Sequence, residues 1–197
     1  MDPAVCVRLA KAYAEGGLRL VEVTFDQAGD PMKTVEAIRA IRESVGDRVH
    51  VGAGTVLTEE QLQLLIDVGG EFMVTPSVNP AIIRRCVAAG LVAMPGAFTP
   101  SEIVAAHEAG ADVVKVFPVR ALGPQYVKDV LAPLRHIRLM AVGGVTPDNA
   151  ADYLRAGCIG VGASGSLVNR ELIAAGAWDK IAAEAARFVR SAADVRR

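Results

Sequence analysis

The sequence predicts one α/β domain, a parallel (β/α)8 barrel of the TIM type, from three observations. Short β-branched apolar runs recur along the 197 residues at steps of about 20 to 30, enough for a strand, a helix and two loops. The segments between them carry helix-capping residues and helical apolar spacing. Two glycine-rich turns follow the last two runs, where such barrels bind phosphate. We expect the domain to span residues 1–197, without a linker or second domain.

Seven runs qualify as strands of this barrel. Each is apolar on both faces, as a parallel strand covered by helices must be. Because the chain opens with a helix at Pro3, we expect the strand ahead of that helix to be missing. Either the translated start is too late or the barrel is incomplete. The seven runs are 19–25, 48–56, 72–77, 91–97, 112–118, 138–144 and 159–165.

Helix starts are marked by a capping residue followed by proline, whose missing N–H is harmless at the first helical position. Capping-box spacing adds a start at Thr58 with Gln61 and strengthens the one at Thr99 with Glu102. Two further helices are expected over about 125–134 and 177–193. The five residues that precede a proline in this way are Asp2, Asp30, Asn79, Thr99 and Thr146.

The composition excludes several classes of function. With 52% hydrophobic and 22% charged residues, the chain is expected to fold rather than stay disordered. Its formal net charge of −1 gives little attraction to a phosphate backbone, so we expect no nucleic acid partner. The sequence has neither an apolar stretch of about 18 residues nor a secretory signal, which predicts a soluble cytoplasmic protein with no membrane partner. Cys6, Cys86 and Cys158 are expected to be reduced thiols.

Two charged residues are expected inside the barrel. In the run 112–118, alternation turns Val114 and Val116 toward the helices and leaves Lys115 facing inward. The same parity turns Glu22 inward. Burial lowers the pKa of a lysine, and a neutral amine can attack a ketone and form a Schiff base, with the glutamate moving protons. A buried structural ion pair between Glu22 and Lys115 is the alternative.

The histidines are not placed for metal-assisted chemistry. Such a site needs imidazole and carboxylate ligands at the carboxyl ends of strands. His50 begins a run, His107 lies in a helical segment and His136 precedes a run. We therefore expect no metal and no other cofactor.

The two glycine-rich turns are candidates for phosphate binding. Gly143 and Gly144 lead directly toward a helix start, and the stretch of Ser164, Gly165 and Ser166 offers bare backbone and two hydroxyls. Steric need for glycine in tight turns is the alternative. The second turn also fits a G-x-G-x-x-G pattern, but only helix follows it, which argues against dinucleotide binding.

Four further residues are candidates for the mouth of the barrel. Thr55 ends its run after two glycines and can offer a hydroxyl to a carboxylate. Pro76 and Pro95 are expected to end their strands and stiffen the pocket wall. Phe117 is expected to face inward and pack over a small keto acid. Taken singly, each of them is better explained as an ordinary structural residue at the end of a barrel strand.

These motifs together resemble the 2-keto-3-deoxy-6-phosphogluconate (KDPG) and 4-hydroxy-2-oxoglutarate (KHG) aldolase family. The resemblance runs through VEVTF, VGAGTV, VTPSVNP, MPGAFTP, VVKVFP, GPQYVK, AVGGVTPDN and VGASGSLV, from about Arg19 to Val168. It implies a homotrimeric class I aldolase on a (β/α)8 barrel. Such an enzyme cleaves a phosphorylated 2-keto-3-deoxy sugar acid, KDPG in the first place, into pyruvate and glyceraldehyde 3-phosphate.

The resemblance also implies roles for individual residues. Lys115 matches the Schiff-base lysine, Glu22 the acid/base glutamate and Thr55 the pyruvate-binding threonine. Gly143, Gly144 and residues 164–166 match the phosphate-binding segments.

Two positions depart from the family pattern. Many members carry an arginine that contacts the pyruvate carboxylate where this chain has Asp26, and the gluconate enzymes carry a hydroxyl where this chain has Val142. The second change resembles the branch that acts on the galactonate epimer. KDPG cleavage is the first hypothesis, with 2-keto-3-deoxy-6-phosphogalactonate or 4-hydroxy-2-oxoglutarate as alternative substrates. A catalytically silent barrel that binds a phosphorylated metabolite is the alternative of another class.

Overall fold

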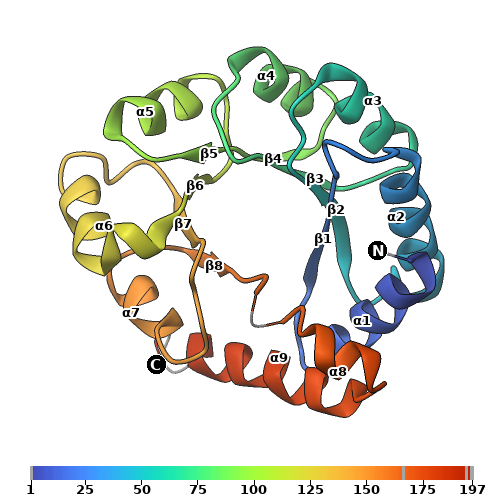
Figure 1. Cartoon of the computed structure of the whole chain (residues 1–197). Coiled ribbons are helices and arrows are strands. Elements are labelled where there is room, and N and C mark those ends of the chain that lie inside the picture. The colour runs from blue at the N-terminus through green and yellow to red at the C-terminus, as the bar shows by residue number, and fades with distance from the viewer. Residues whose placement is uncertain (1, 166, 194, 196–197) are drawn as a thin grey trace.

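The strands form a ring with the helices around its outside (Figure 1). The computed structural model describes residues 2–165, 167–193 and 195. The parallel strands follow one another around the ring in chain order, in two four-stranded sheets, β1-β2-β3-β4 and β5-β6-β7-β8. The strands are β1 (Leu20–Thr24), β2 (His50–Gly54), β3 (Phe72–Val74), β4 (Val92–Met94), β5 (Gly96–Ala97), β6 (Val114–Val116), β7 (Leu139–Val142) and β8 (Gly160–Gly162).

Every predicted run contains a strand, and the run 91–97 contains two. Pro95 separates β4 from β5, because proline cannot donate a hydrogen bond to a neighbouring strand. The expectation that Pro95 ends its strand is therefore confirmed, since β4 ends at Met94. The short strand β5 begins at Gly96 and belongs to the other sheet, where Gly96 pairs with Lys115. The chain passes from one sheet to the other at this proline. The arrangement leaves untested the prediction that a strand is missing ahead of the first helix.

The helices cover the outer face of the ring and alternate with the strands (Figure 1). The predicted helices are confirmed within a few residues. The short helix α8 and a 3₁₀ turn at Val119–Ala121 were not expected from the sequence. The helices are α1 (Pro3–Glu15), α2 (Met32–Val45), α3 (Glu59–Asp67), α4 (Pro80–Ala88), α5 (Pro100–Glu108), α6 (Gly123–Leu131), α7 (Ala150–Arg155), α8 (Arg170–Ala174) and α9 (Trp178–Ala193).

Most of the predicted caps are formed. Asp2 accepts from the N–H of Ala4 at 2.7 Å, and Asn79 caps α4 through the N–H groups of its first turn. Capping boxes at Thr58 and Thr99 open α3 and α5. Asp30 accepts from the N–H of the first residue of α2 at 2.9 Å, although Pro31 occupies the cap position.

Thr146 is not a helix cap. The helix α7 begins at Ala150, after Asn149. The Asn149 side chain instead bridges the preceding loop, accepting from the N–H of Thr146 at 2.8 Å and donating to the carbonyl of Gly144 at 3.1 Å. The predicted start is therefore wrong, because an amide side chain can both accept and donate, and here it satisfies the loop.

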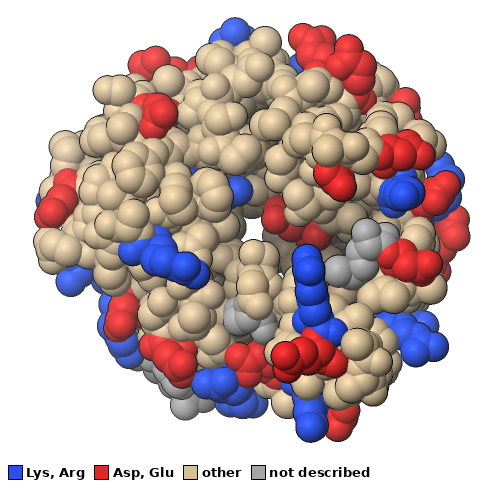
Figure 2. All heavy atoms as spheres, in the orientation of Figure 1, with Lys and Arg blue, Asp and Glu red and all other residues tan. Residues whose placement is uncertain are grey.

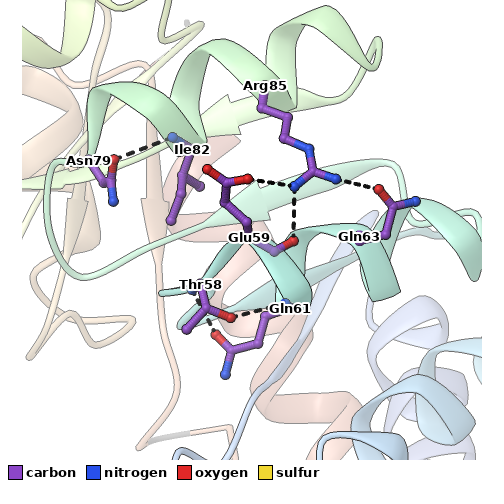
Figure 3. Close-up of polar contacts among 7 residues, drawn as sticks. All are labelled: Thr58, Glu59, Gln61, Gln63, Asn79, Ile82 and Arg85. Atoms are coloured by element: carbon purple, nitrogen blue, oxygen red, sulfur yellow. Dashed lines mark hydrogen bonds and ion pairs between the residues drawn. The ribbon is translucent and has the colours of Figure 1, made fainter.

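Neighbouring helices are also tied by side chains, as Figure 3 shows for α3 and α4. Arg85 of α4 donates to the Glu59 carboxylate at 3.0 Å and to the Glu59 carbonyl at 3.3 Å, and also hydrogen-bonds to Gln63. These contacts are exposed, so their contribution to stability is at most about 1 kcal/mol each. They fix the register of two helices whose buried faces do most of the packing.

The apolar core is divided by the sheet. Met73 and Ala93 belong to the large outer cluster between strands and helices. A separate small cluster contains Phe72, Val74 and Met94, with Val113 and Met140 packed against it. Because successive strand residues face opposite sides, this second cluster lies inside the ring. The barrel interior is therefore only partly filled by apolar side chains.

No described helix combines the length and apolar character needed to span a bilayer.

Gly52 makes room for this inner cluster, and its substitution tests the packing. A Cβ atom on Gly52 would lie 2.3 Å from the carbonyl oxygen of Phe72 and 2.4 Å from its ring. We expect Gly52→Ala to lower the free energy of unfolding by about 1–3 kcal/mol, because backbone and ring must both move. Urea denaturation followed by circular dichroism measures the change. Gly160→Ala is the matched control, since its Cβ would meet nothing within 4 Å. Equal stability of the two variants would contradict this packing.

Candidate active site

Lys115 lies inside the ring, as its parity predicts. It is the middle residue of β6 and only 7% exposed, while Val114 and Val116 on either side are fully buried in the outer core. Its backbone N–H donates to the carbonyl of Pro95 at 2.8 Å. The Nζ atom stands 4.5 Å from the centre of the Phe117 ring. Phe117 thus faces inward as expected, and its ring limits where the amine can move.

Glu22 reaches the interior from the other side of the ring, where β1 lies opposite β6 (Figure 1). Its neighbour Val21 is buried in the outer core. A Cβ atom on Gly54, on the adjacent strand, would lie 3.0 Å from a carboxylate oxygen of Glu22. Glycine at this position therefore gives the carboxylate its room. Figure 2 shows the centre of this face hollowed, with acidic and basic side chains at the wall.

The protein shifts the pKa of both groups toward their neutral forms. Burial lowers the pKa of Lys115, and the charge of Glu22 opposes that shift. Burial raises the pKa of Glu22, and the charge of Lys115 opposes it. The Glu22 side chain is nevertheless exposed. The two observations agree if the carboxylate lies in an open channel, where water reaches it while protein atoms surround it on most sides.

No ion pair joins Glu22 to Lys115 in the described structure. The ion pairs with nitrogen and oxygen within 4.0 Å all lie between other residues. The alternative of a close structural ion pair is therefore not supported. The two groups sense each other's charge across a space wider than a salt bridge. Such a space can hold a reacting carbon atom between an amine and a proton carrier.

Thr55 follows β2 in a strained conformation. Its φ is 55°, in the left-handed region that residues other than glycine seldom adopt. Gln27 holds this turn, since its side-chain amide donates to the carbonyl of Thr55 at 2.9 Å and to that of Phe25 at 3.2 Å. Gln61 in turn donates to Gln27 at 3.0 Å. Sequence reasoning missed Gln27, because no motif distinguishes a loop glutamine that binds a backbone far along the chain.

Asp26 stabilises its own loop. Its carboxylate accepts from the N–H of Ala28 at 3.1 Å, and the side chain is exposed. This turn accounts for an aspartate here, because such side chains commonly bond the backbone two residues on.

Pro76 and Pro95 meet at Gly96. A Cβ atom on Gly96 would lie 2.6 Å from the carbonyl group of Pro76, and the buried hydroxyl of Thr75 accepts from the N–H of Gly96 at 3.3 Å. The two prolines therefore lie in neighbouring, closely packed segments beside Lys115, which fits the predicted stiff wall. The peptide between Phe117 and Pro118, on the other side of the lysine, is cis.

The first glycine-rich turn lines a cavity. Gly143 and Gly144 have φ of 92° and 93°, and Cβ atoms there would clash with Pro118 and with Arg120. The cavity has a volume of about 330 Å³ and is lined by Pro118, Arg120, Ala121, Gly143 and Gly144. Close packing therefore requires glycine at both positions, while phosphate binding at this turn stays a prediction. No sequence motif indicates Arg120, because a single arginine in a loop forms no pattern.

The second glycine-rich turn does not join this cavity in the described structure. Ser164 and Gly165 are exposed after β8 and are not among its lining residues. Ser166, the third predicted residue of this turn, lies outside the described residues. Its predicted part in phosphate binding stays a prediction.

The histidines lie where the sequence places them. His50 pairs with Glu71 at 2.6 Å, and His107 packs edge to face against His136 with ring centres 5.2 Å apart. Among the described residues, no three His, Cys, Asp or Glu side chains converge as a metal site would need.

The chain matches known proteins along most of its length. A family model described as "KDPG and KHG aldolase" matches residues 2–184. The chain is 39% identical to 2-dehydro-3-deoxy-6-phosphogalactonate aldolase of Escherichia coli over 87% of this chain and 84% of that protein. It is 37% identical to 2-dehydro-3-deoxy-phosphogluconate aldolase of Treponema pallidum over 90% and 82%. A solved structure titled "Native KDPGal structure" superposes with a TM-score of 0.88 at 36% identity, covering 100% of this chain and 92% of that one.

Removing the lysine charge tests the coupling of the two groups. We expect the pKa of Glu22 to rise further in Lys115→Met, because the ammonium that favours the carboxylate is lost. Titration of the Glu22 carboxyl carbon by NMR in both proteins measures the change. Lys128→Met, on the outer helix α6, is the control and should leave this pKa where it is. An unchanged pKa in Lys115→Met would show that the groups do not face each other.

Proposed function

We propose, since the chain belongs to the KDPG and KHG aldolase family and is thus a class I aldolase, that it cleaves a 2-keto-3-deoxy-6-phospho sugar acid. The products are pyruvate and glyceraldehyde 3-phosphate, and the intermediate is a Schiff base on Lys115. The single observation that carries this assignment is the environment of Lys115. This lysine is 7% exposed inside the barrel, burial lowers its pKa, and no carboxylate among the described residues lies within 4.0 Å of its amine.

The first half of the reaction joins the substrate to the enzyme. The neutral Nζ of Lys115 adds to the keto carbon C2, and the amine proton passes to the oxygen. The hydroxyl of this carbinolamine leaves as water with a proton from Glu22, which leaves an iminium ion and a carboxylate. Burial raises the pKa of this carboxyl, which brings it closer to the range in which a side chain can both give and take a proton.

The second half breaks the carbon–carbon bond. The Glu22 carboxylate takes the proton of the C4 hydroxyl, the C3–C4 bond breaks, and its electron pair passes through C3 to the iminium nitrogen. The aldehyde leaves, and Glu22 returns the proton to C3 of the enamine. Water then adds to the iminium carbon and gives a proton to the Glu22 carboxylate. The resulting carbinolamine passes its hydroxyl proton to the nitrogen and collapses to pyruvate and the free amine. The strained Thr55, held by Gln27, offers a hydroxyl for the pyruvate carboxylate.

The galactonate epimer is the substrate that the relatives and one residue favour. KDPG, the first hypothesis from sequence, remains the second candidate, since proteins named for each epimer are 37–39% identical to this chain. Val142 ends β7 directly before Gly143 and presents a methyl group where the gluconate enzymes carry a hydroxyl. A hydroxyl group in a binding site discriminates strongly only between a ligand that can form a hydrogen bond with it and a ligand that cannot. Assembly as a homotrimer and a cytoplasmic location stay predictions.

Trapping with borohydride tests the covalent step. We expect pyruvate plus borohydride to give one adduct, on Lys115, and Lys115→Met to give none, because the amine is the nucleophile. Mass spectrometry of the digested protein locates the adduct. Glu22→Gln should slow cleavage by about 10²–10⁴-fold through loss of the proton carrier. Binding of phosphate esters without any adduct would instead support the silent barrel, and full activity of Lys115→Met would overturn the mechanism.

Parallel assays on the two epimers test the substrate. We expect the wild-type kcat/KM to be higher for the galactonate epimer, and Val142→Thr to move the ratio about tenfold toward the gluconate epimer, since one hydroxyl contact is gained. Val142→Ala is the control for lost volume. It should lower kcat/KM for both epimers without moving their ratio toward the gluconate epimer. A wild-type preference for the gluconate epimer would reverse the assignment.

A further inference from the structure

Arg120 is exposed and lies at the wall of the cavity beside the first glycine-rich turn. The position that a Cβ atom of Gly144 would take is 2.6 Å from the Nε atom of Arg120 and 2.7 Å from its Cβ. The backbone N–H of Arg120 donates to the carbonyl of Gly143 at 2.9 Å. The arginine therefore crosses the turn closely, and it can do so only because Gly144 has no side chain.

The charge of Arg120 has no partner in the part of the chain that the structure describes. No carboxylate oxygen there lies within 4.0 Å of its guanidinium group. Its four companions in the cavity wall, two glycines, a proline and an alanine, carry no charge. A guanidinium group offers several N–H donors in one plane, a geometry that suits phosphate oxygens. A cavity with one such cation fits an anionic ligand.

The cavity adjoins the reacting lysine through Phe117. The ring of Phe117 lies 4.5 Å from Nζ of Lys115, and a Cβ atom on Gly143 would lie 3.1 Å from the same ring. A substrate held at its keto carbon by Lys115 can therefore extend along Phe117 toward the cavity. The end of the substrate remote from the keto group is the end that carries phosphate. The lysine and the cation belong to one short stretch of chain, and the turn at Gly143 and Gly144 closes the cavity from the next strand.

We propose that Arg120 binds the phosphate group of the substrate and so selects phosphorylated over unphosphorylated keto acids. The proposal rests on the proposed function and adds to it a specificity-determining residue. The phosphate oxygens accept from the guanidinium group in the cavity, while Lys115 and Glu22 act on the other end of the molecule. Unphosphorylated 4-hydroxy-2-oxoglutarate would occupy the same lysine without this contact.

Substitution of Arg120 with two separate readouts tests the proposal. Arg120→Met keeps much of the length and removes the charge. We expect its KM for the phosphorylated substrate to rise about 10- to 100-fold, as loss of a charge-assisted hydrogen bond implies. For each variant, the rate of hydrogen exchange at the pyruvate methyl group is measured by NMR in heavy water. The kcat/KM of the variant is then divided by this rate. That exchange needs Lys115 and Glu22 but no phosphate. Lys128→Met on α6 is the matched control for a lost surface charge.

Inorganic phosphate supplies an independent measurement on the unaltered protein. We expect it to compete with the phosphorylated substrate in the wild type, and its inhibition constant to rise at least tenfold in Arg120→Met. Arg120→Lys, which keeps the charge but not the planar fork, should fall between the two. If Arg120→Met does not fold, the Lys variant and the phosphate competition still decide the matter.

The outcomes separate this proposal from the function on which it rests. A wild type that exchanges no pyruvate protons would refute the aldolase mechanism. Normal exchange together with an unchanged KM in Arg120→Met would refute the role of Arg120 alone. An equal loss of affinity for phosphorylated and unphosphorylated substrates would also refute it, since that result describes a structural residue.

Discussion

The cost of placing an amine and a carboxyl inside one apolar ring is the constraint on which the site depends. Lys115 and Glu22 enter from strands on opposite sides, and burial shifts each pKa toward the neutral form. A closer approach would form a salt bridge and stabilise both charges. The observed separation, beyond 4.0 Å, leaves the amine closer to its nucleophilic form and leaves space for a substrate carbon.

The surrounding fold maintains this separation by leaving out side chains. Gly54 makes room for the Glu22 carboxylate, and Gly96 lets the Pro76 segment approach the strand beside Lys115. The small inner cluster around Phe72 fills only part of the barrel. A larger residue at any of these places would either fill the space or move a charged group. Likewise, the absence of a side chain at Gly144 lets Arg120 reach the wall of the cavity.

Much of this arrangement could be predicted from the sequence, because short-range rules govern it. Strand parity placed Lys115 and Glu22 inside, and the caps at Asp2, Asn79 and Thr99 needed only neighbouring residues. The failures involve contacts between distant segments. Thr146 does not cap a helix, because the side chain of Asn149 bridges the loop instead. Arg120 contacts Gly144 only in the folded chain. Pro95 ends β4 as predicted, because this too is a local rule: proline cannot donate to a neighbouring strand.

The most direct test of the account is the pKa of Lys115 in the free protein, measured by NMR titration of its side chain. We expect a value below that of the exposed lysines of the same chain, because burial opposes the ammonium more strongly than Glu22 supports it. A value at or above theirs would mean that the amine stays charged and solvated. In that case the barrel does not prepare a nucleophile, and the proposed chemistry loses its physical basis.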